Sequence, residues 1–324
     1  MKSRLIVGLA VSAVLFILAA RHVNLKDLVS LIKDVNLFYL CASMAFTILA
    51  VWLRALRWRF LLPESSAVKT SNLFVATMMG YMGNNLLPLR VGDIARAYIA
   101  ARRERASTSA FLATVVVERL LDVFTLLLIF GVLFFFIPFP SWLKKGAYML
   151  LGASLLALAL LLWVKAKKEH VESFIQRIFS FPGKRRLGDL SQAFSEGLKG
   201  LEGGWELVVV AFLSIPLWLL YALMTYTALR ASNLDLPLVA SWVVLSFLGI
   251  AVSIPSAPGF IGTFQFFSVA ALALFAVDEG HAFGFSLIFQ FSQFVPITLI
   301  GWFLLLREHM VLSDLAAIKQ RIKN

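Results

Sequence analysis

The sequence predicts an all-α polytopic membrane protein with about six full spans and two re-entrant helical hairpins, arranged as an inverted repeat. Of its 324 residues, 60% are hydrophobic and only 15% are charged, which is more apolar than soluble domains are. Apolar runs long enough to cross a bilayer recur along the chain. Two further apolar runs are short and are followed by asparagine, proline and glycine, which favours hairpins over spans.

The formal net charge of +12 is concentrated between the apolar runs. Cations next to spans mark the cytoplasmic side of a membrane, so we expect a lipid bilayer as the partner and no nucleic acid. The single cysteine lies inside an apolar run and excludes a disulfide framework. The four histidines are scattered without ligand spacing, so we expect no metal site and no other cofactor.

The first two spans are predicted at residues 5–20 and 37–53. Residues 5–20 follow Lys2 and Arg4 and resemble a signal peptide, but no clear cleavage site follows, and we expect an uncleaved span that starts in the cytoplasm. Residues 24–35 separate apolar from charged side chains, as a helix at the outer interface does. The second span returns inward. Its inner end is a basic and aromatic anchor, formed by Arg54, Arg57, Trp58 and Arg59.

The first hairpin is predicted where the apolar run 73–82 stops short of a span. Gly83, two asparagines and Pro88 interrupt the run, and proline cannot continue a helical hydrogen-bond ladder. Basic segments flank this stretch on both sides and both belong in the cytoplasm. The chain therefore enters and leaves the membrane on one side. Broken backbone at membrane depth is how transporters build binding sites.

The remaining spans are expected at residues 108–137, 146–164, 206–229 and 283–306. A basic linker with two amphipathic pieces, residues 165–204, is expected on the cytoplasmic side. Both termini are predicted to be cytoplasmic, and the whole chain is predicted to be a single domain of the cytoplasmic (inner) membrane.

The second hairpin is predicted on the outer side. Residues 239–254 reach only ~24 Å as a helix, short of the ~30 Å hydrocarbon core. A turn with prolines and glycines follows, then residues 263–277, and the flanks carry acidic residues but no lysine or arginine. The hairpins occupy corresponding places in two inverted halves, about 1–140 and 141–324. Their tips are expected to meet near the membrane midplane.

Charged residues of the first half form the candidate substrate-binding site. Glu118 and Asp122 are four residues apart and share a helix face, whereas Arg119 points ~100° away. Charges inside a span need partners and indicate function. We expect those partners on the hairpin, where arginines match phosphate oxygens and a helix starting near Gly92 offers free N–H groups. The candidate residues are Asn84, Asn85, Arg90, Asp93, Arg96, Glu118, Arg119 and Asp122.

Two alternatives stay open for these residues: a structural ion-pair network, and a charged loop at the membrane surface. The turn of the second hairpin is the candidate gate, because two prolines and two glycines make a rigid turn with open backbone. An ordinary interhelical turn is its alternative. The candidate gate residues are Pro255, Pro258, Gly259, Gly262 and Gln265.

Three motifs follow one another along the chain: Asn84-Asn85-Leu86-Leu87-Pro88-x-Arg90-x-Gly92-Asp93-x-x-Arg96, Glu118-Arg119-x-x-Asp122 and Pro255-x-x-Pro258-Gly259-x-x-Gly262. Together they resemble the lysylphosphatidylglycerol synthase/flippase transmembrane family over essentially the whole chain. The resemblance implies a flippase-like domain with paired re-entrant helices that moves lipids, or lipid-linked molecules, between leaflets.

The chain departs from that family in two respects. Full-length aminoacyl-phospholipid synthases append a soluble acyltransferase-type domain, which this sequence lacks, so we expect no aminoacyl transfer. Gln265 stands where the family often has an acidic residue. This departure weakens the expectation of a cationic aminoacyl headgroup or of a proton role at that position.

The expected function is that of an integral membrane lipid translocase and not of an enzyme, so no catalytic residues are assigned. The substrate is expected to be an anionic phospholipid or an isoprenoid-phosphate lipid. Arginines would hold its phosphate, and the carboxylates would fix them or carry a coupling proton. The sequence has no nucleotide-binding Gly-x-x-x-x-Gly-Lys-Ser/Thr motif, so transport would be passive or ion-coupled.

Two other functions stay open. One is a non-transporting membrane subunit of a lipid or cell-envelope glycan assembly system, acting with a partner lipid-modifying enzyme. The other is a membrane enzyme that acts on a lipid phosphate, for which the sequence offers no clear nucleophile or metal cluster. A homo-oligomer is compatible with all three.

Overall fold

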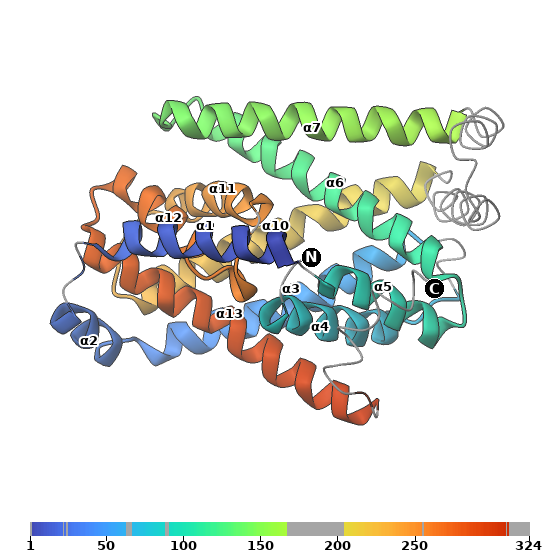
Figure 1. Cartoon of the computed structure of the whole chain (residues 1–324), viewed down its shortest axis with the longest axis horizontal. Coiled ribbons are helices and arrows are strands. Elements are labelled where there is room, and N and C mark those ends of the chain that lie inside the picture. Colours follow the sequence, from blue (N-terminus) through green and yellow to red (C-terminus); the bar gives the residue numbers. More distant parts are fainter. Residues whose placement is uncertain are drawn as a thin grey trace.

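The computed structural model describes residues 2–21, 23, 25–62, 67–87, 91–166, 204–254, 256–308 and 310, and these contain helices, turns and loops but no strand. The α-helices are α1 (Lys2–Ala20), α2 (Leu25–Lys33), α3 (Leu37–Arg59), α4 (Thr70–Leu86), α5 (Val91–Glu104), α6 (Thr108–Leu133), α7 (Ser141–Ala166), α10 (Gly204–Ala231), α11 (Leu238–Ser253), α12 (Thr263–Leu272) and α13 (Glu279–Arg307). Two short 3₁₀ turns, η3 (Pro258–Phe260) and η4 (Ala273–Phe275), flank α12 (Figure 1). The predicted all-helical fold is confirmed.

Four helical stretches of the described chain are long and apolar enough to cross a membrane by length and composition: Leu37–Arg59, Gly204–Ala231, Pro258–Phe275 and Glu279–Arg307. Large apolar side chains are exposed on the outer faces of several helices, as they are on proteins that lie in lipid. The predicted six spans and their inverted arrangement stay predictions. Most of the expected linker 165–204 lies outside the described residues, which end at Ala166 and resume at Gly204.

The first hairpin is formed by α4 and α5, which pack against each other through two glycines. A Cβ atom on Gly92 would lie only 1.8 Å from the carbonyl oxygen of Gly80. Asn84 accepts a hydrogen bond from the backbone N–H of Gly92 at 2.9 Å and so fastens the two helices together. The helix break comes later than predicted, because α4 continues through Gly83 to Leu86. Burial of Gly83 between neighbouring helices offsets its low helix propensity.

The second hairpin pairs α11, which has the predicted length of 16 residues, with α12. Its turn uses the left-handed backbone that favours glycine, with φ of 66° at Gly259 and 89° at Gly262. A Cβ on Gly259 would lie 3.4 Å from the carbonyl oxygen of Asn85, at the end of α4. The tips of the two hairpins therefore meet, as expected. Their depth in a membrane stays a prediction.

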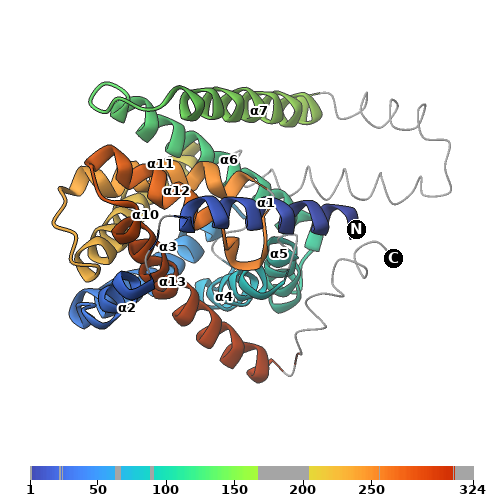
Figure 2. The ribbon, with the colours of Figure 1, turned by 60° about the vertical axis from the view of Figure 1, so that its left-hand side comes forward.

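The hairpins are held by the longer helices around them. Helix α3 packs along α10, and α13 crosses α3 and α4. In both views α1 lies across α12, while α7 runs along one side of the molecule and is joined to the rest mainly through α6 (Figures 1 and 2). Helices α3 and α6 converge on α5 of the first hairpin, and five charged side chains meet there.

Candidate functional site

Five charged side chains from three helices meet inside the protein, and we call them the charge cluster. They are Arg54 and Arg57 of α3, Arg96 of α5, and Glu118 and Asp122 of α6. Arg57, Arg96 and Glu118 have no exposed surface, and Asp122 is the most exposed member with 13% of its side chain accessible. Helix geometry explains the convergence, because residues three or four apart face one neighbour.

Each carboxylate of the charge cluster contacts more than one guanidinium group. Glu118 accepts hydrogen bonds from both Nη atoms of Arg96, at 3.0 and 3.4 Å, and lies 3.3 Å from Nε of Arg54. Asp122 accepts a hydrogen bond from Arg57 at 2.6 Å and another from Arg54. Such charge-assisted pairs offset the large cost of removing these groups from water.

Neutral polar and aromatic side chains complete the surroundings of the arginines. Arg54 donates to the Tyr81 hydroxyl at 2.7 Å, and Arg57 donates to the Ser214 hydroxyl at 3.0 Å. The guanidinium of Arg96 lies over the ring of Trp58, 4.8 Å from its centroid, in a cation–π contact. These contacts fix the arginines in position without adding negative charge.

The charge cluster carries one more positive than negative charge, since three arginines face two carboxylates. The Nε atoms of Arg57 and Arg96 are buried and make no hydrogen bond with the protein, whereas Arg54 Nε is in ion-pair contact with Glu118. Buried donors without acceptors are costly and are rare in folded proteins. Excess positive charge and unused donors together make this a site that favours an additional anion.

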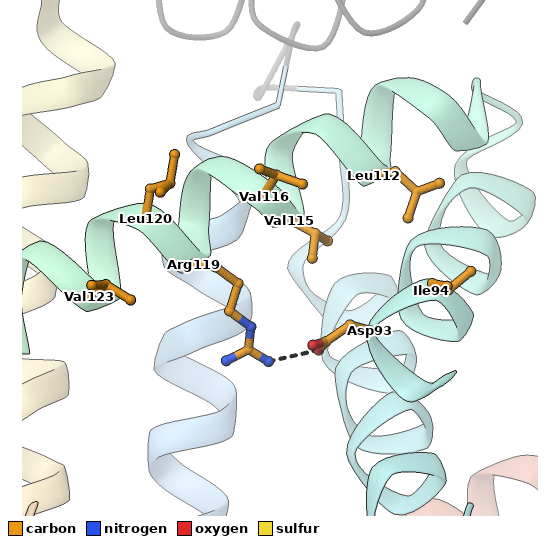
Figure 3. Close-up of a pocket in the computed structure, with 8 residues that line it drawn as sticks. All are labelled: Asp93, Ile94, Leu112, Val115, Val116, Arg119, Leu120 and Val123. Atoms are coloured by element: carbon orange, nitrogen blue, oxygen red, sulfur yellow. Dashed lines mark hydrogen bonds and ion pairs between the residues drawn. The ribbon is translucent and has the colours of Figure 1, made fainter. Parts of the chain in front are cut away.

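Next to the charge cluster, a groove of about 320 Å³ lies between α5 and α6 (Figure 3). Its walls are apolar, and its polar groups are Asp93 and Arg119, whose side chains point toward one another. Arg119 donates to Asp93 at 2.7 Å, and 38% of the Arg119 side chain is exposed. The apolar lining residues are Ile94, Leu112, Val115, Val116, Leu120 and Val123.

Charges of alternating sign connect the groove to the charge cluster. Asp93 lies between Arg119 and Arg96, with its Oδ1 atom 3.8 Å from Arg96 Nε. Arg96 in turn binds Glu118, which lies beside Arg54 and Arg57. Arginines and carboxylates therefore alternate from Arg119 in the groove to the buried charge cluster.

The structure brings together five of the eight predicted substrate-binding residues: Asp93, Arg96, Glu118, Arg119 and Asp122. Glu118 and Asp122 face the same neighbours, as predicted, whereas Arg119 points toward Asp93 in the groove. Asn84 and Asn85 lie apart from these contacts: Asn84 binds Gly92, and Asn85 donates to the Thr298 hydroxyl of α13 at 3.1 Å. Arg90 lies outside the described residues.

Sequence reasoning missed Arg54 and Arg57, which it assigned with Trp58 to an anchor at the membrane boundary. That interpretation is wrong for these three residues, because all are buried. Helix α3 continues to Arg59, and its last two turns lie against α6 and α10. The three-residue spacing of Arg54 and Arg57, which puts both on one helix face, was the available signal.

At the predicted gate, two glutamines hold the turn before α12. Gln265 accepts a hydrogen bond from the N–H of Gly262 at 2.7 Å and donates to Gln290 at 2.5 Å. Gln290 donates to the carbonyl oxygen of Gly259 at 2.5 Å. Helix α1 covers the turn, because Ser12 accepts from the N–H of Ala257 at 2.7 Å. Pro258 begins η3, and Pro255 lies outside the described residues.

Among the described residues, no group of three or more histidine, cysteine, aspartate or glutamate side chains is arranged to hold a metal ion.

Comparison with known proteins decides the family. Residues 5–301 match the family described as the lysylphosphatidylglycerol synthase TM region. The chain belongs to this family. The match spans both hairpins, the charge cluster and the groove. No solved structure matches the chain.

Three curated relatives are similar in sequence. The UPF0104 membrane protein MJ1595 of Methanocaldococcus jannaschii is 24% identical, over 92% of this chain and 93% of that protein. The UPF0104 membrane protein MJ1078 of the same organism is 23% identical, over 67% of this chain and 90% of that protein. Glycosyltransferase AglD of Haloferax volcanii is 22% identical, over 86% of this chain but only 50% of its own length.

Proposed function

We propose that this protein moves an anionic, phosphate-bearing lipid between the two leaflets of the cytoplasmic membrane. The observation that carries the proposal is the alternating row of charges that leads from the groove at Arg119 into the charge cluster. Membership of the lysylphosphatidylglycerol synthase TM region family supports it. Ionisable residues at membrane depth are retained mainly where a polar substrate or ion must pass.

The substrate class follows from the donors. A guanidinium group can bind two phosphate oxygens at once. The charge cluster also has one more positive than negative charge, which an additional anion would neutralise. An anionic phospholipid and an isoprenoid-phosphate lipid both offer such a group. In this proposal Arg96 and Arg119 bind the phosphate together with Arg54 and Arg57, and Arg90 is a further candidate. Glu118, Asp122 and Asp93 position the arginines or carry a coupling proton.

Passage to the other leaflet requires the meeting hairpin tips to part. The turn from Pro255 to Gly262 is the proposed gate, held closed by Gln265, Gln290 and Ser12. Rocking of residues 1–140 against residues 141–324 would expose the charge cluster to each leaflet in turn.

Leaflet exchange in proteoliposomes tests this function. Purified protein would be reconstituted with three fluorescent probes: phosphatidylglycerol, a polyprenyl phosphate, and a diacylglycerol that has no phosphate. Vesicles without protein report the background rate. The proposal predicts protein-dependent exchange of at least one phosphate-bearing probe but not of diacylglycerol. Exchange of none of the three, or of all three equally, would contradict it.

A second candidate function has one specific observation in its favour. The chain matches half the length of a protein named as a glycosyltransferase. We therefore keep the alternative that this protein is a membrane subunit that presents a lipid to a partner lipid-modifying enzyme without moving it. Binding of a phosphate-bearing probe without exchange, in the same vesicles, would favour this alternative.

A further inference from the structure

The groove between α5 and α6 combines a lipid-like surface with one exposed cation. Six apolar side chains line it, and the guanidinium of Arg119 is its positive group. Among the described residues that line the groove, the negative group is Asp93, which is 23% exposed and already paired with Arg119. In a membrane, such a groove suits a hydrocarbon chain, with an anionic headgroup next to Arg119.

Asp93 lies between two arginines, and only one of them, Arg119, donates a hydrogen bond to it. Its Oδ1 atom is 2.7 Å from Nη2 of Arg119 and 3.8 Å from Nε of Arg96. Arg96 is fully buried, and its Nε makes no hydrogen bond. A side-chain rotation that moves the Asp93 carboxylate by about 1 Å would bring Oδ1 within hydrogen-bond range of Arg96 Nε.

We propose that the phosphate of a membrane lipid takes the place of Asp93 on Arg119, and that the displaced carboxylate turns to Arg96. The lipid chain then lies along the apolar wall of the groove. This inference rests on the proposed function, since it makes the groove the entry point for the lipid that the charge cluster passes on.

Electrostatics favour the exchange of partners. Before the lipid binds, Asp93 accepts a hydrogen bond from Arg119, while the buried Nε of Arg96 has no acceptor. After the lipid binds, Arg119 binds the phosphate and Asp93 accepts from Arg96 Nε. Each charge then still has a partner, and the buried Nε of Arg96 gains an acceptor. Because Arg96 also binds Glu118, occupancy of the groove is communicated to the charge cluster.

The apolar wall distinguishes a lipid from free phosphate. A free ion would contact Arg119 and leave the six apolar side chains without a partner, whereas a lipid chain covers them. Val116, whose side chain lines the groove, tests this part: Val116→Trp fills the space with a large ring.

The two members of the ion pair should have opposite effects on binding. Arg119→Gln removes the phosphate ligand and should weaken binding about tenfold or more. Asp93→Asn removes the competing carboxylate and should tighten binding about two- to fivefold, the factor that corresponds to an exposed ion pair. A purely structural ion pair predicts that both changes act in the same direction. Arg119→Lys, which keeps the charge but loses the planar fork, serves if Arg119→Gln does not fold.

Binding is measured on the full chain in a neutral detergent, by fluorescence anisotropy of phosphatidylglycerol labelled on its acyl chain. The matched controls are Arg230→Gln and Asp235→Asn, which separate another ion pair that shares no residue with the groove. Acyl-labelled diacylglycerol tests the need for phosphate, and inorganic phosphate tests the need for the chain.

The inference is supported if Arg119→Gln and Val116→Trp weaken binding, Asp93→Asn tightens it, and the controls do not change it. It is overturned if Asp93→Asn weakens binding as Arg119→Gln does, or if neither changes it. Equal binding of diacylglycerol, or displacement by inorganic phosphate at the concentration at which the lipid binds, also overturns it.

Failure of this inference is separable from failure of the proposed function. If Arg119→Gln and Asp93→Asn have opposite effects on binding but the protein exchanges no lipid in vesicles, the groove is supported as a lipid-binding site and translocation is rejected. Lipid exchange that is unaffected by Arg119→Gln and Val116→Trp would keep translocation and reject the groove as the entry point.

Discussion

Each arginine and carboxylate of the charge cluster depends on the others for its charge to be tolerated inside the protein. Glu118 is the member shared most widely, since Arg96, Arg54 and Arg57 all lie within 3.7 Å of it. Asp122 is shared by Arg54 and Arg57. Removing a carboxylate therefore leaves buried positive charge uncompensated, whereas removing one arginine brings the charge cluster to neutrality.

Glu118→Gln should destabilise the protein strongly, by about 3–5 kcal/mol, because buried Arg96 would lose the carboxylate that accepts from both its Nη atoms. The measurement is the free energy of unfolding in detergent, followed by circular dichroism in denaturant. Glu308→Gln is the matched control, since Glu308 pairs with Arg103 in a partly exposed position and should cost about 1 kcal/mol or less. Equal losses in the two variants would contradict the account of the charge cluster.

The sequence revealed a buried charged residue only where its neighbours in the chain made the charge unusual. Glu118 and Asp122 stand out because they interrupt an apolar span, and their common face follows from their spacing. Arg54 and Arg57 stand at the end of an apolar run, where a basic residue is ordinary. Only the packing of α6 and α10 against the end of α3 distinguishes a buried arginine from an anchor, and that is a tertiary contact.

At the scale of the elements, the hairpin α4–α5 presents the cation Arg96 to the interior. Its two helices approach closely because Gly80 and Gly92 have no side chains at the crossing. This approach brings Asp93 and Arg96, which follow Gly92 on α5, beside α6. The geometry of the site thus depends on Gly92, a residue that carries no charge itself.

Gly92→Ala should separate α4 from α5 and weaken both folding and lipid binding. Its Cβ would lie 1.8 Å from a backbone oxygen, which cannot move without displacing the helix, and overpacking of this kind costs about 1–3 kcal/mol or more. Gly131→Ala on α6 is the control, because no atom lies within 4 Å of its added Cβ, and it should stabilise the helix by up to about 1 kcal/mol. Thermal unfolding of the two variants gives the comparison, and equal midpoints would contradict this packing.

The elements themselves were largely predictable, because apolar runs and their interruptions fix where helices begin and end. The end of α4 was not, since Gly83 and the two asparagines are poor helix formers yet remain helical up to Leu86. Their hydrogen bonds to Gly92 and to Thr298 come from distant segments, and local propensity contains no information about them.

At the scale of the whole molecule, the two hairpins lie toward opposite ends of the bundle in Figure 1 while their tips meet. This arrangement is what two inverted halves would produce, although the inversion itself stays a prediction. Charge in the loops gives the expected orientation, with the basic loop after α5 in the cytoplasm and the acidic loop before α11 outside.

Cysteine labelling of intact cells tests that orientation. In a Cys41→Ser background, a membrane-impermeant maleimide should label Asp235→Cys, in the loop before α11. It should not label Ala106→Cys, in the loop after α5, until the cells are opened. Both positions are exposed in the folded protein, so burial does not explain a difference. Labelling in the reverse order would contradict the predicted topology.

The central claim is that the excess positive charge of the charge cluster is there to accept a lipid phosphate. Arg57→Gln tests it most directly, because Glu118 keeps Arg96, Asp122 keeps Arg54, and the charge cluster becomes neutral. The measurement is the leaflet exchange rate of a phosphate-bearing probe in proteoliposomes, with Arg103→Gln as control. We predict that Arg57→Gln lowers the rate about tenfold or more while its unfolding temperature stays near that of the native protein. An unchanged rate in this folded variant would contradict the claim.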